Sequence, residues 1–98
     1  MARDAFRFVE SVCDEQTFIE FVAALADDRR RSVAREKISP SSPYGPEANG
    51  WENVTIESFF EAAVMWAEAS INGTSTYRKS DNPWRRCAEI LYMGKIYE

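Results

Sequence analysis

The clearest pattern of apolar positions lies between residues 15 and 36. Four large apolar side chains recur there at the i, i+3, i+4 and i+7 spacing of one helix face: Phe18, Phe21, Val22 and Leu25. Asp14 precedes this segment, where its carboxylate can cap the first turn. Apolar positions become sparse beyond Ala26, so we expect the second half of this helix to be solvated or frayed before Pro40.

A second helix is predicted over residues 56 to 70. Its apolar stripe follows the helical period and comprises Ile56, Phe59, Phe60, Ala63, Val64 and Ala67, with Trp66 beside it. Thr55 is a suitable N-cap, and the Asn72-Gly73 dipeptide is typical of the turn that follows a helix.

A third helix is predicted over residues 83 to 93. Asn82 can cap it, and Pro83 occupies the first helical position, where a missing N–H costs nothing. The helical spacing returns in Trp84, Cys87, Ala88 and Leu91. Gly94 is expected to end the helix.

Two segments have weaker patterns. Residues 1 to 12 mix a strand-like alternation with a helical spacing, and we favour a short helix. Residues 39 to 53 begin with SPSSPYGPEANG, which excludes a helix interior or a central strand. We expect a long proline-rich loop there.

These elements predict an all-α fold, a small bundle of three main helices at about 15–36, 56–70 and 83–93 with a short N-terminal helix and a long loop at 39–53. At 98 residues the chain fits one domain with one core. The expected core consists of Phe18, Phe21, Val22, Leu25, Ile56, Phe59, Phe60, Ala63, Trp66, Trp84, Cys87, Leu91 and Ile96.

Composition narrows the class of protein. A hydrophobic content of 45% is too high for a disordered chain, and the apolar runs are too short to cross a bilayer. The first residues lack the pattern of an export signal, and two cysteines do not form a disulfide framework. We therefore expect a cytoplasmic protein that does not enter the membrane, with both thiols reduced.

Charge is distributed unevenly along the chain. The net charge is −4, and residues 39 to 76 contain no Lys or Arg. The acids of this block are Glu47, Glu52, Glu57, Glu61 and Glu68. An acidic protein lacks the positive field that nucleic-acid binding requires. Arg29, Arg30 and Arg31, or Arg85 and Arg86, could contact phosphate, but neighbouring Asp27 and Asp28 favour neutralisation, so no nucleic-acid partner is expected.

Few residues are suited to catalysis. The chain has no histidine, the commonest general base and metal ligand, and it contains no glycine-rich nucleotide-binding motif. Cys13 and Cys87 lack the spacing of a zinc or dithiol site, and Cys87 is expected to be buried. We expect no catalytic residue, no metal site and no cofactor.

Glu57, Glu61 and Glu68 form a carboxylate stripe, since their i, i+4, i+11 spacing places them on one helix face. The stripe has three interpretations: a solvated face, an anionic surface for a basic protein partner, or part of a site for a hard cation or a shared proton. The last requires further carboxylates, for which Glu52 and Glu89 are the candidates.

The aromatic residues also have two interpretations. Trp51, Trp66 and Trp84 stand where large side chains can fill the space between converging helix ends. If Tyr44 and Trp51 are instead exposed beside each other, the proline-rich loop becomes a candidate binding surface.

Several short motifs stand in the second half of the chain: Trp51-Glu52-Asn53 with Thr55-Ile56, then Phe59, Glu61-Ala62 and Trp66, and finally Pro83, Ala88, Ile90-Leu91 and the ending Ile96-Tyr97-Glu98. Together they resemble a family of small bacterial domains of unknown function. The match covers residues 51 to 98 well and residues 18 to 28 loosely. The resemblance implies no activity, cofactor or catalytic residue, and the SPSSPYGPEANG segment is longer than the corresponding connection in many relatives.

These observations predict a small non-enzymatic protein-interaction domain. Its candidate contact residues are Tyr44, Trp51, Glu57, Glu61 and Glu68, and its partner is a protein. An immunity-like protein that binds a toxin is one alternative, by analogy with other small acidic bacterial proteins. Another is a ligand- or metal-binding protein, or an enzyme, that uses Glu57, Glu61 and Glu89.

Overall fold

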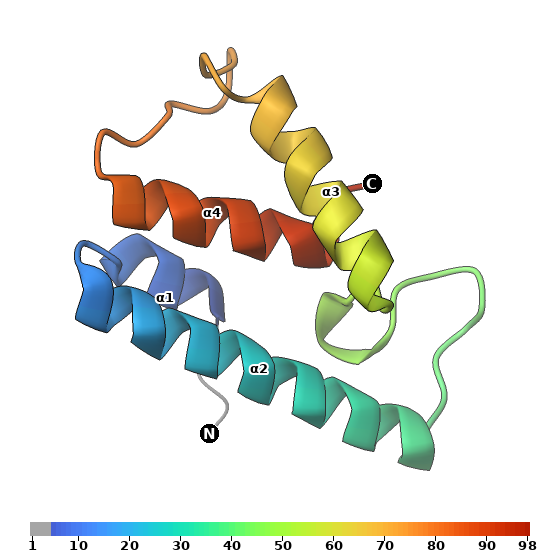
Figure 1. Cartoon of the computed structure of the whole chain (residues 1–98). Coiled ribbons are helices and arrows are strands. Elements are labelled where there is room, and N and C mark those ends of the chain that lie inside the picture. The colour runs from blue at the N-terminus through green and yellow to red at the C-terminus, as the bar shows by residue number, and fades with distance from the viewer. Residues whose placement is uncertain (1–4) are drawn as a thin grey trace.

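The fold is all-α, as predicted, in the computed structural model (Figure 1), which describes residues 5–98. The helices are α1 (Ala5–Ser11), α2 (Glu15–Ile38), α3 (Ile56–Ala69) and α4 (Pro83–Ile96), with a 3-10 turn, η1 (Ala48–Gly50). Those residues contain no β-strand. The short N-terminal helix is confirmed from Ala5 onward, while residues 1–4 lie outside the described part of the chain.

The helix starts follow from local side-chain chemistry. Asp14 and Thr55 each accept a hydrogen bond from the backbone N–H three residues later, in capping boxes completed by Thr17 and Ser58. Asn82 accepts from the two N–H groups that follow Pro83. These caps satisfy N–H groups that have no partner within the helix, so α2, α3 and α4 begin where the sequence predicts.

The second half of α2 is a regular helix to Ile38 and most of its side chains are exposed, so of the two expectations for it, solvated or frayed, the solvated one is confirmed. The loop after it folds back along it and supplies hydrogen-bond partners. Ser32 is fully buried and donates to the carbonyl of Ala48 at 2.7 Å, while the Glu36 carboxylate accepts from Ser41 and from the N–H of Ala48. These contacts replace the apolar packing that the sequence lacks there.

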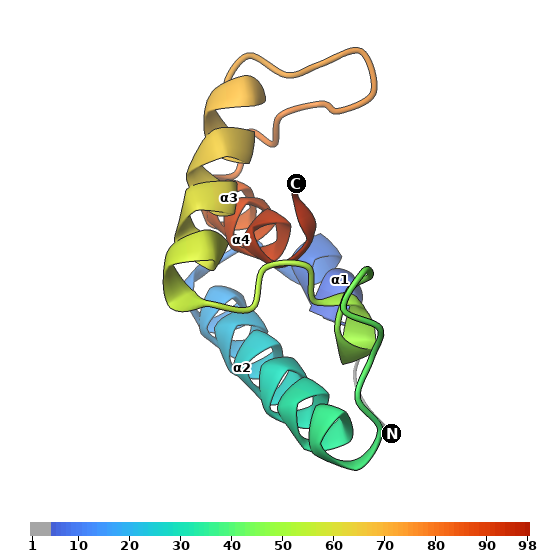
Figure 2. The same ribbon diagram turned by 90° about the vertical axis from the view of Figure 1, so that its right-hand side faces the viewer.

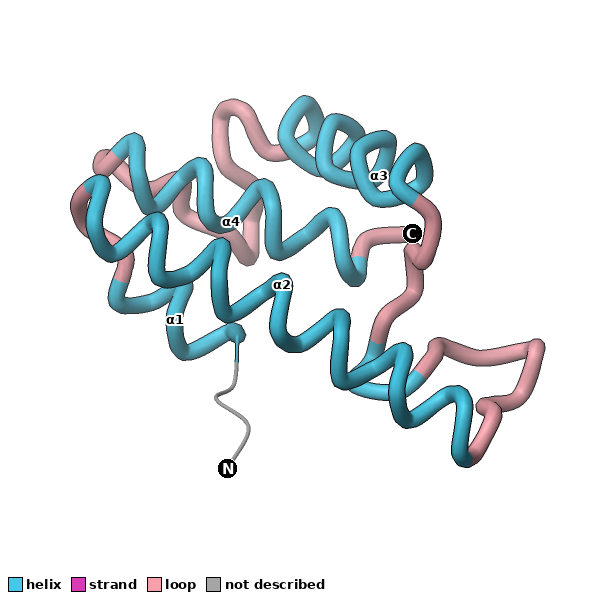
Figure 3. The backbone as a smooth tube through the Cα atoms, turned by 60° about the horizontal axis from the view of Figure 1, so that its bottom comes forward, coloured by secondary structure: helices cyan, strands magenta, loops and turns pink. Residues whose placement is uncertain are grey.

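Helix α4 occupies the middle of the fold. It packs against α1 and α2 on one side and against α3 on the other, and α3 scarcely touches α2. In Figures 1 and 2, α2 and α4 lie side by side and α3 crosses the C-terminal end of α4. Figure 3 shows that the middle of the loop after α2 projects beyond the helices before the chain returns to α2. Consequently, α2 and α3 diverge on either side of α4.

The core lies between α1, α2 and α4 and includes Trp51, which follows η1 in the segment before α3. Its buried members are Val9, Val12, Phe21, Leu25, Trp51 and Ala88, with Phe8, Phe18, Phe59, Leu91 and Tyr92 packed around them. Within α3, Ala62 and Ala63 are buried and Trp66 is half-buried. The predicted contributions of Phe18, Phe21, Leu25, Phe59, Ala63 and Leu91 are confirmed.

Five residues of the predicted core are exposed instead. They are Val22, Ile56, Phe60, Trp84 and Cys87, of which Ile56 is 76% and Phe60 56% exposed. Val22, Ile56 and Phe60 are exposed because α2 and α3 diverge and leave a groove between them. The helical period alone cannot show which part of a wide apolar stripe another helix will cover.

Gly94 does not end α4, which continues for two more residues to Ile96. A Cβ added at Gly94 would lie only 2.9 Å from the backbone oxygen of Phe59. The glycine therefore permits the close crossing of α3 and α4, and a larger residue would push the two helices apart.

Candidate functional site

A buried polar cluster joins α2, the segment before α3 and the end of α4. Asp28 accepts a hydrogen bond from the Trp51 indole N–H at 2.9 Å and pairs with the Lys95 ammonium at 2.8 Å. The Lys95 and Asp28 side chains are only 8% and 12% exposed. Lys95 also lies over the Trp51 ring, 5.4 Å from its centroid. We call Asp28, Trp51 and Lys95 the clasp.

The two residues after Trp51 continue this connection to α4. The Asn53 side-chain amide donates to the carbonyls of Gly94 and Tyr97, and the N–H of Glu52 donates to the carbonyl of Lys95. The Trp51-Glu52-Asn53 motif therefore satisfies carbonyl groups that the helix end leaves without partners. The pKa of Glu52 is raised, first by a hydrogen bond shared with the Glu98 carboxyl group and then by desolvation.

A second polar cluster surrounds Arg86 at the other end of α3. Its guanidinium donates to Ser70 Oγ and to the carbonyl of Ala67, and it lies 4.9 Å from the centroid of the Trp66 ring. The Tyr77 hydroxyl accepts from Arg86 and donates to Glu89 at 2.6 Å, and burial raises the pKa of Tyr77. Together these contacts fasten the 70–82 loop to α4.

The Arg86 cluster bears on two roles suggested by the sequence: phosphate contact by Arg86, and a carboxylate site that combines Glu89 with the glutamates of α3. Arg86 is only 9% exposed, so it does not offer its charge to phosphate as the sequence pattern allowed. Glu89 hydrogen-bonds to Tyr77 and pairs with Arg85 at 3.8 Å, and it is not grouped with the α3 glutamates. Within residues 5–98, no group of three His, Cys, Asp or Glu is placed to hold a metal ion.

An apolar groove lies between α2 and α3, with a volume of about 560 Å³. Leu25, Trp51, Phe59 and Leu91 contribute partly or fully buried side chains to it. The complete lining is Val22, Leu25, Ala26, Arg29, Trp51, Asn53, Val54, Thr55, Ile56, Phe59, Phe60 and Leu91. We call it the α2–α3 groove, and its surface is almost entirely carbon.

The polar groups of the groove are used within the protein. Arg29 pairs with Glu47 at 3.0 Å, and its guanidinium lies 5.3 Å from the centroid of the Trp51 ring. Asn53 is held by α4 and Thr55 caps α3. The groove can therefore make apolar contacts with a ligand, but it presents few hydrogen-bonding or reactive groups.

Exposed apolar residues extend the groove along α3. Ile56, Phe60 and Val64 follow one another at four-residue spacing, and all are more than half exposed. Because i and i+4 side chains are neighbours on a helix, these three form one continuous stripe. An uncovered stripe of this kind beside a groove is typical of a contact surface.

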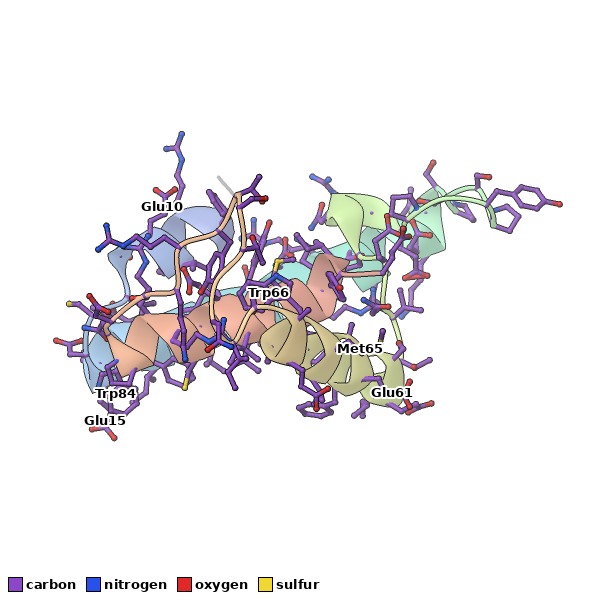
Figure 4. The ribbon with its side chains drawn as sticks, turned by 90° about the horizontal axis from the view of Figure 1, so that it is seen from above. Glu10, Glu15, Glu61, Met65, Trp66 and Trp84 are labelled. Atoms are coloured by element: carbon purple, nitrogen blue, oxygen red, sulfur yellow. The ribbon has the colours of Figure 1, made fainter. Side chains whose placement is uncertain are left out.

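The predicted contact residues lie in three different environments. Glu57, Glu61 and Glu68 are exposed on α3, and Figure 4 shows Glu61 on that helix, far from Trp84 at the other end of the view. Tyr44 is 97% exposed at the tip of the loop after α2, whereas Trp51 is 5% exposed. The exposed aromatic pair considered for the loop is therefore absent, and Trp51 serves the core and the clasp.

Neither the clasp nor the groove was predicted from the sequence. A signal for the clasp was present, since Asp28 follows Phe21 by seven residues and Lys95 follows Leu91 by four, which places both charges on apolar faces. Charges at such positions are seldom buried without partners. Arg86 had no comparable signal, because its partners lie in an irregular loop and at the end of another helix.

The pattern of one sequence family matches residues 14–98, which include the clasp, the Arg86 cluster and the groove. The chain belongs to the DUF7660 family. DUF7660 is described as a family of unknown function, which confirms the resemblance drawn from the Trp51-Glu52-Asn53 motif and its companions. No curated protein and no solved structure matches the chain significantly.

Three of the residues that carry the resemblance have structural roles. Trp51 lies in the clasp, Asn53 binds the end of α4, and Trp66 packs against Arg86. These residues thus help to hold the fold together. Among the described residues, no helix is both long enough and apolar enough to span a membrane.

Proposed function

We propose that this DUF7660 chain is a small non-enzymatic domain that binds another protein through the α2–α3 groove and works in the cytoplasm of a bacterium. One observation carries the proposal: an apolar groove of about 560 Å³ continues into the exposed stripe of Ile56, Phe60 and Val64. Covering these side chains would remove carbon surface from water and so stabilise a complex.

The chemistry around the groove supports binding rather than catalysis. Its polar residues, Arg29, Asn53 and Thr55, are engaged in internal hydrogen bonds or ion pairs. A reaction would require groups that donate or accept protons, or attack a substrate, at the surface of the groove. Apolar contact, in contrast, requires only the residues that line it.

Affinity capture with matched variants tests the proposal. Phe60→Asp places a charge in the groove at an exposed position, so the fold should be kept while binding is lost. Tyr44→Asp places the same charge on the loop, which was the other predicted contact surface. Each protein is used as bait in a lysate of the organism that encodes it, and circular dichroism verifies that both variants are helical.

The three baits give distinct results. A stoichiometric partner that the wild type and Tyr44→Asp retain, and that Phe60→Asp loses, supports the groove. A partner lost only by Tyr44→Asp would move the contact surface to the loop and contradict the proposal. Failure of every bait to retain a stoichiometric protein would count against a protein-binding domain altogether.

A further inference from the structure

The carboxylates beside the α3 stripe have no cationic partner of their own. Glu57 and Glu61 directly follow Ile56 and Phe60, so helical geometry places them along one edge of the stripe, and Glu68 continues that edge. Among the ion pairs of residues 5–98, none includes any of these three glutamates. The groove is therefore bordered on its α3 side by unneutralised negative charge.

The cations of α2 and α4 nearest the groove and the clasp are already paired. Arg29 is bound to Glu47, Arg30 and Arg31 share Asp27, and Lys95 is held by Asp28. Residues 39 to 76, which include all of α3, contain no Lys or Arg. Neutralisation of the α3 edge must therefore come from solvent ions or from another molecule.

The walls of the groove favour a helix, rather than an extended peptide, as the bound segment. An extended peptide entering an apolar site needs hydrogen-bond partners for its backbone, which an exposed strand edge provides and the sides of two helices do not. A helix satisfies its backbone internally and can place large side chains at i, i+4 and i+7 into a groove. A third helix between α2 and α3 would also complete the packing that their divergence leaves open.

A second copy of this chain is a poor match for the groove. Each copy has a net charge of −4 and the same acidic edge. If α3 paired with α3 of a second copy in an antiparallel two-fold arrangement, the two acidic edges would lie on the same side of the interface. Glu57, Glu61 and Glu68 of one copy would then lie opposite the same three glutamates of the other. Like charges placed opposite each other weaken association, so the edge selects against this pairing and in favour of a basic partner.

We infer, building on the proposed function, that the α2–α3 groove takes an amphipathic helix of another protein whose apolar stripe is flanked on one side by Lys or Arg. The apolar side chains of that helix contact Phe59, Phe60 and Leu91. Its basic flank lies along Glu57, Glu61 and Glu68. Apolar burial supplies most of the affinity, and the charges set the orientation and the choice of partner.

A displayed peptide library tests this inference without knowledge of the natural partner. Its members are about 18 residues long, with fixed apolar residues at helical spacing and randomised polar positions. Selections are run on the wild type, on Phe60→Asp and on the Glu57→Lys/Glu61→Lys/Glu68→Lys variant. All substituted positions are exposed, and denaturation midpoints establish that each variant is folded.

We expect peptides selected on the wild type to be enriched in Lys and Arg on one flank only. Phe60→Asp should weaken their binding by about tenfold or more, and the triple Lys variant should select Asp and Glu on the same flank. Added salt should weaken wild-type binding, because the edge carboxylates are exposed and their attraction is screened.

The possible failures are distinguishable. Peptides that require Phe60 but show no basic flank would overturn the inference and leave the proposed groove function intact. No peptide dependent on Phe60 would contradict both. Sedimentation that shows a wild-type dimer dissociated by Phe60→Asp would identify a second copy as the occupant, and the inference would be wrong.

Discussion

The clasp and the α2–α3 groove share Trp51 but differ in which side chains they bury: the clasp buries polar groups, and the groove leaves apolar side chains exposed. In the clasp, the indole N–H, a carboxylate and an ammonium group are buried and bonded to one another. In the groove, large apolar side chains such as Phe60 remain in water. The clasp therefore belongs to the folded state, whereas the groove surface is available to a second molecule.

This contrast follows from the different costs of burial and exposure. A buried charge without a partner costs several kcal/mol. Asp28 and Lys95 must therefore remain paired for as long as the clasp is buried. An apolar side chain left in water forgoes only about 25 cal/mol per Å². A small fold can tolerate that loss at the groove, and a binding partner can recover it.

The largest expected effect is the removal of the carboxylate at the centre of the clasp. Asp28→Ala leaves Lys95 buried without its counter-charge and Trp51 without its acceptor, so it should lower the free energy of unfolding by about 3 to 5 kcal/mol. Urea denaturation measures the change. The adjacent Asp27→Ala breaks only exposed pairs with Arg30 and Arg31 and should cost less than about 1 kcal/mol. Equal losses in the two variants would refute the distinction.

The next largest effect is a difference in stability loss between substitutions at two adjacent residues, Phe59 beside the clasp and Phe60 in the groove. Phe59 stacks on Trp51 with ring centroids 6.0 Å apart and lies against Gly94, so Phe59→Ala should cost about 3 kcal/mol. Phe60→Ala removes a side chain that is 56% exposed and should cost less than about 1 kcal/mol. Thermal or urea unfolding of both variants makes the comparison. A larger loss at Phe60 would mean that the groove is closed in solution.

The smallest expected effect concerns the loop that supports α2. Hydrogen bonds from the Ser41 side chain and backbone lower the pKa of Glu36 below its ordinary 4.5. The ionised carboxylate therefore stabilises the fold above that value, and the contribution disappears as the pH falls through the lowered pKa. In Glu36→Gln, the stability deficit should be present at neutral pH and narrow on acidification. Midpoints measured across this range test the sign, with Glu61→Gln on α3 as the reference for losing one carboxylate.

The helices could be predicted because their signals are local. The caps at Asp14, Thr55 and Asn82 and the apolar spacing after each cap act within a few residues, and the structure has helices starting there. The end of α2 was harder to predict. It depends on Ala48, which is twelve residues beyond Glu36 and reaches it only because the loop folds back.

The candidate site could be predicted only in part. The carboxylate stripe on α3 follows from the helical period, and its exposure follows from charge. The groove beside it depends on how far α3 lies from α2, which no local pattern specifies. Phe59 and Phe60 look alike in the sequence, yet only Phe59 is packed into the core. The clasp depends on Asp28 and Lys95, which are 67 positions apart.

The three tryptophans occupy three distinct surroundings, and this gives the protein its own optical reporters. Trp51 is enclosed beside an ion pair, Trp66 faces a guanidinium, and Trp84 is 38% open to solvent near the start of α4. Chains that keep a single indole, with phenylalanine at the other two positions, would emit at different wavelengths. Quenchers, denaturants and binding partners could then be followed region by region without attaching a dye.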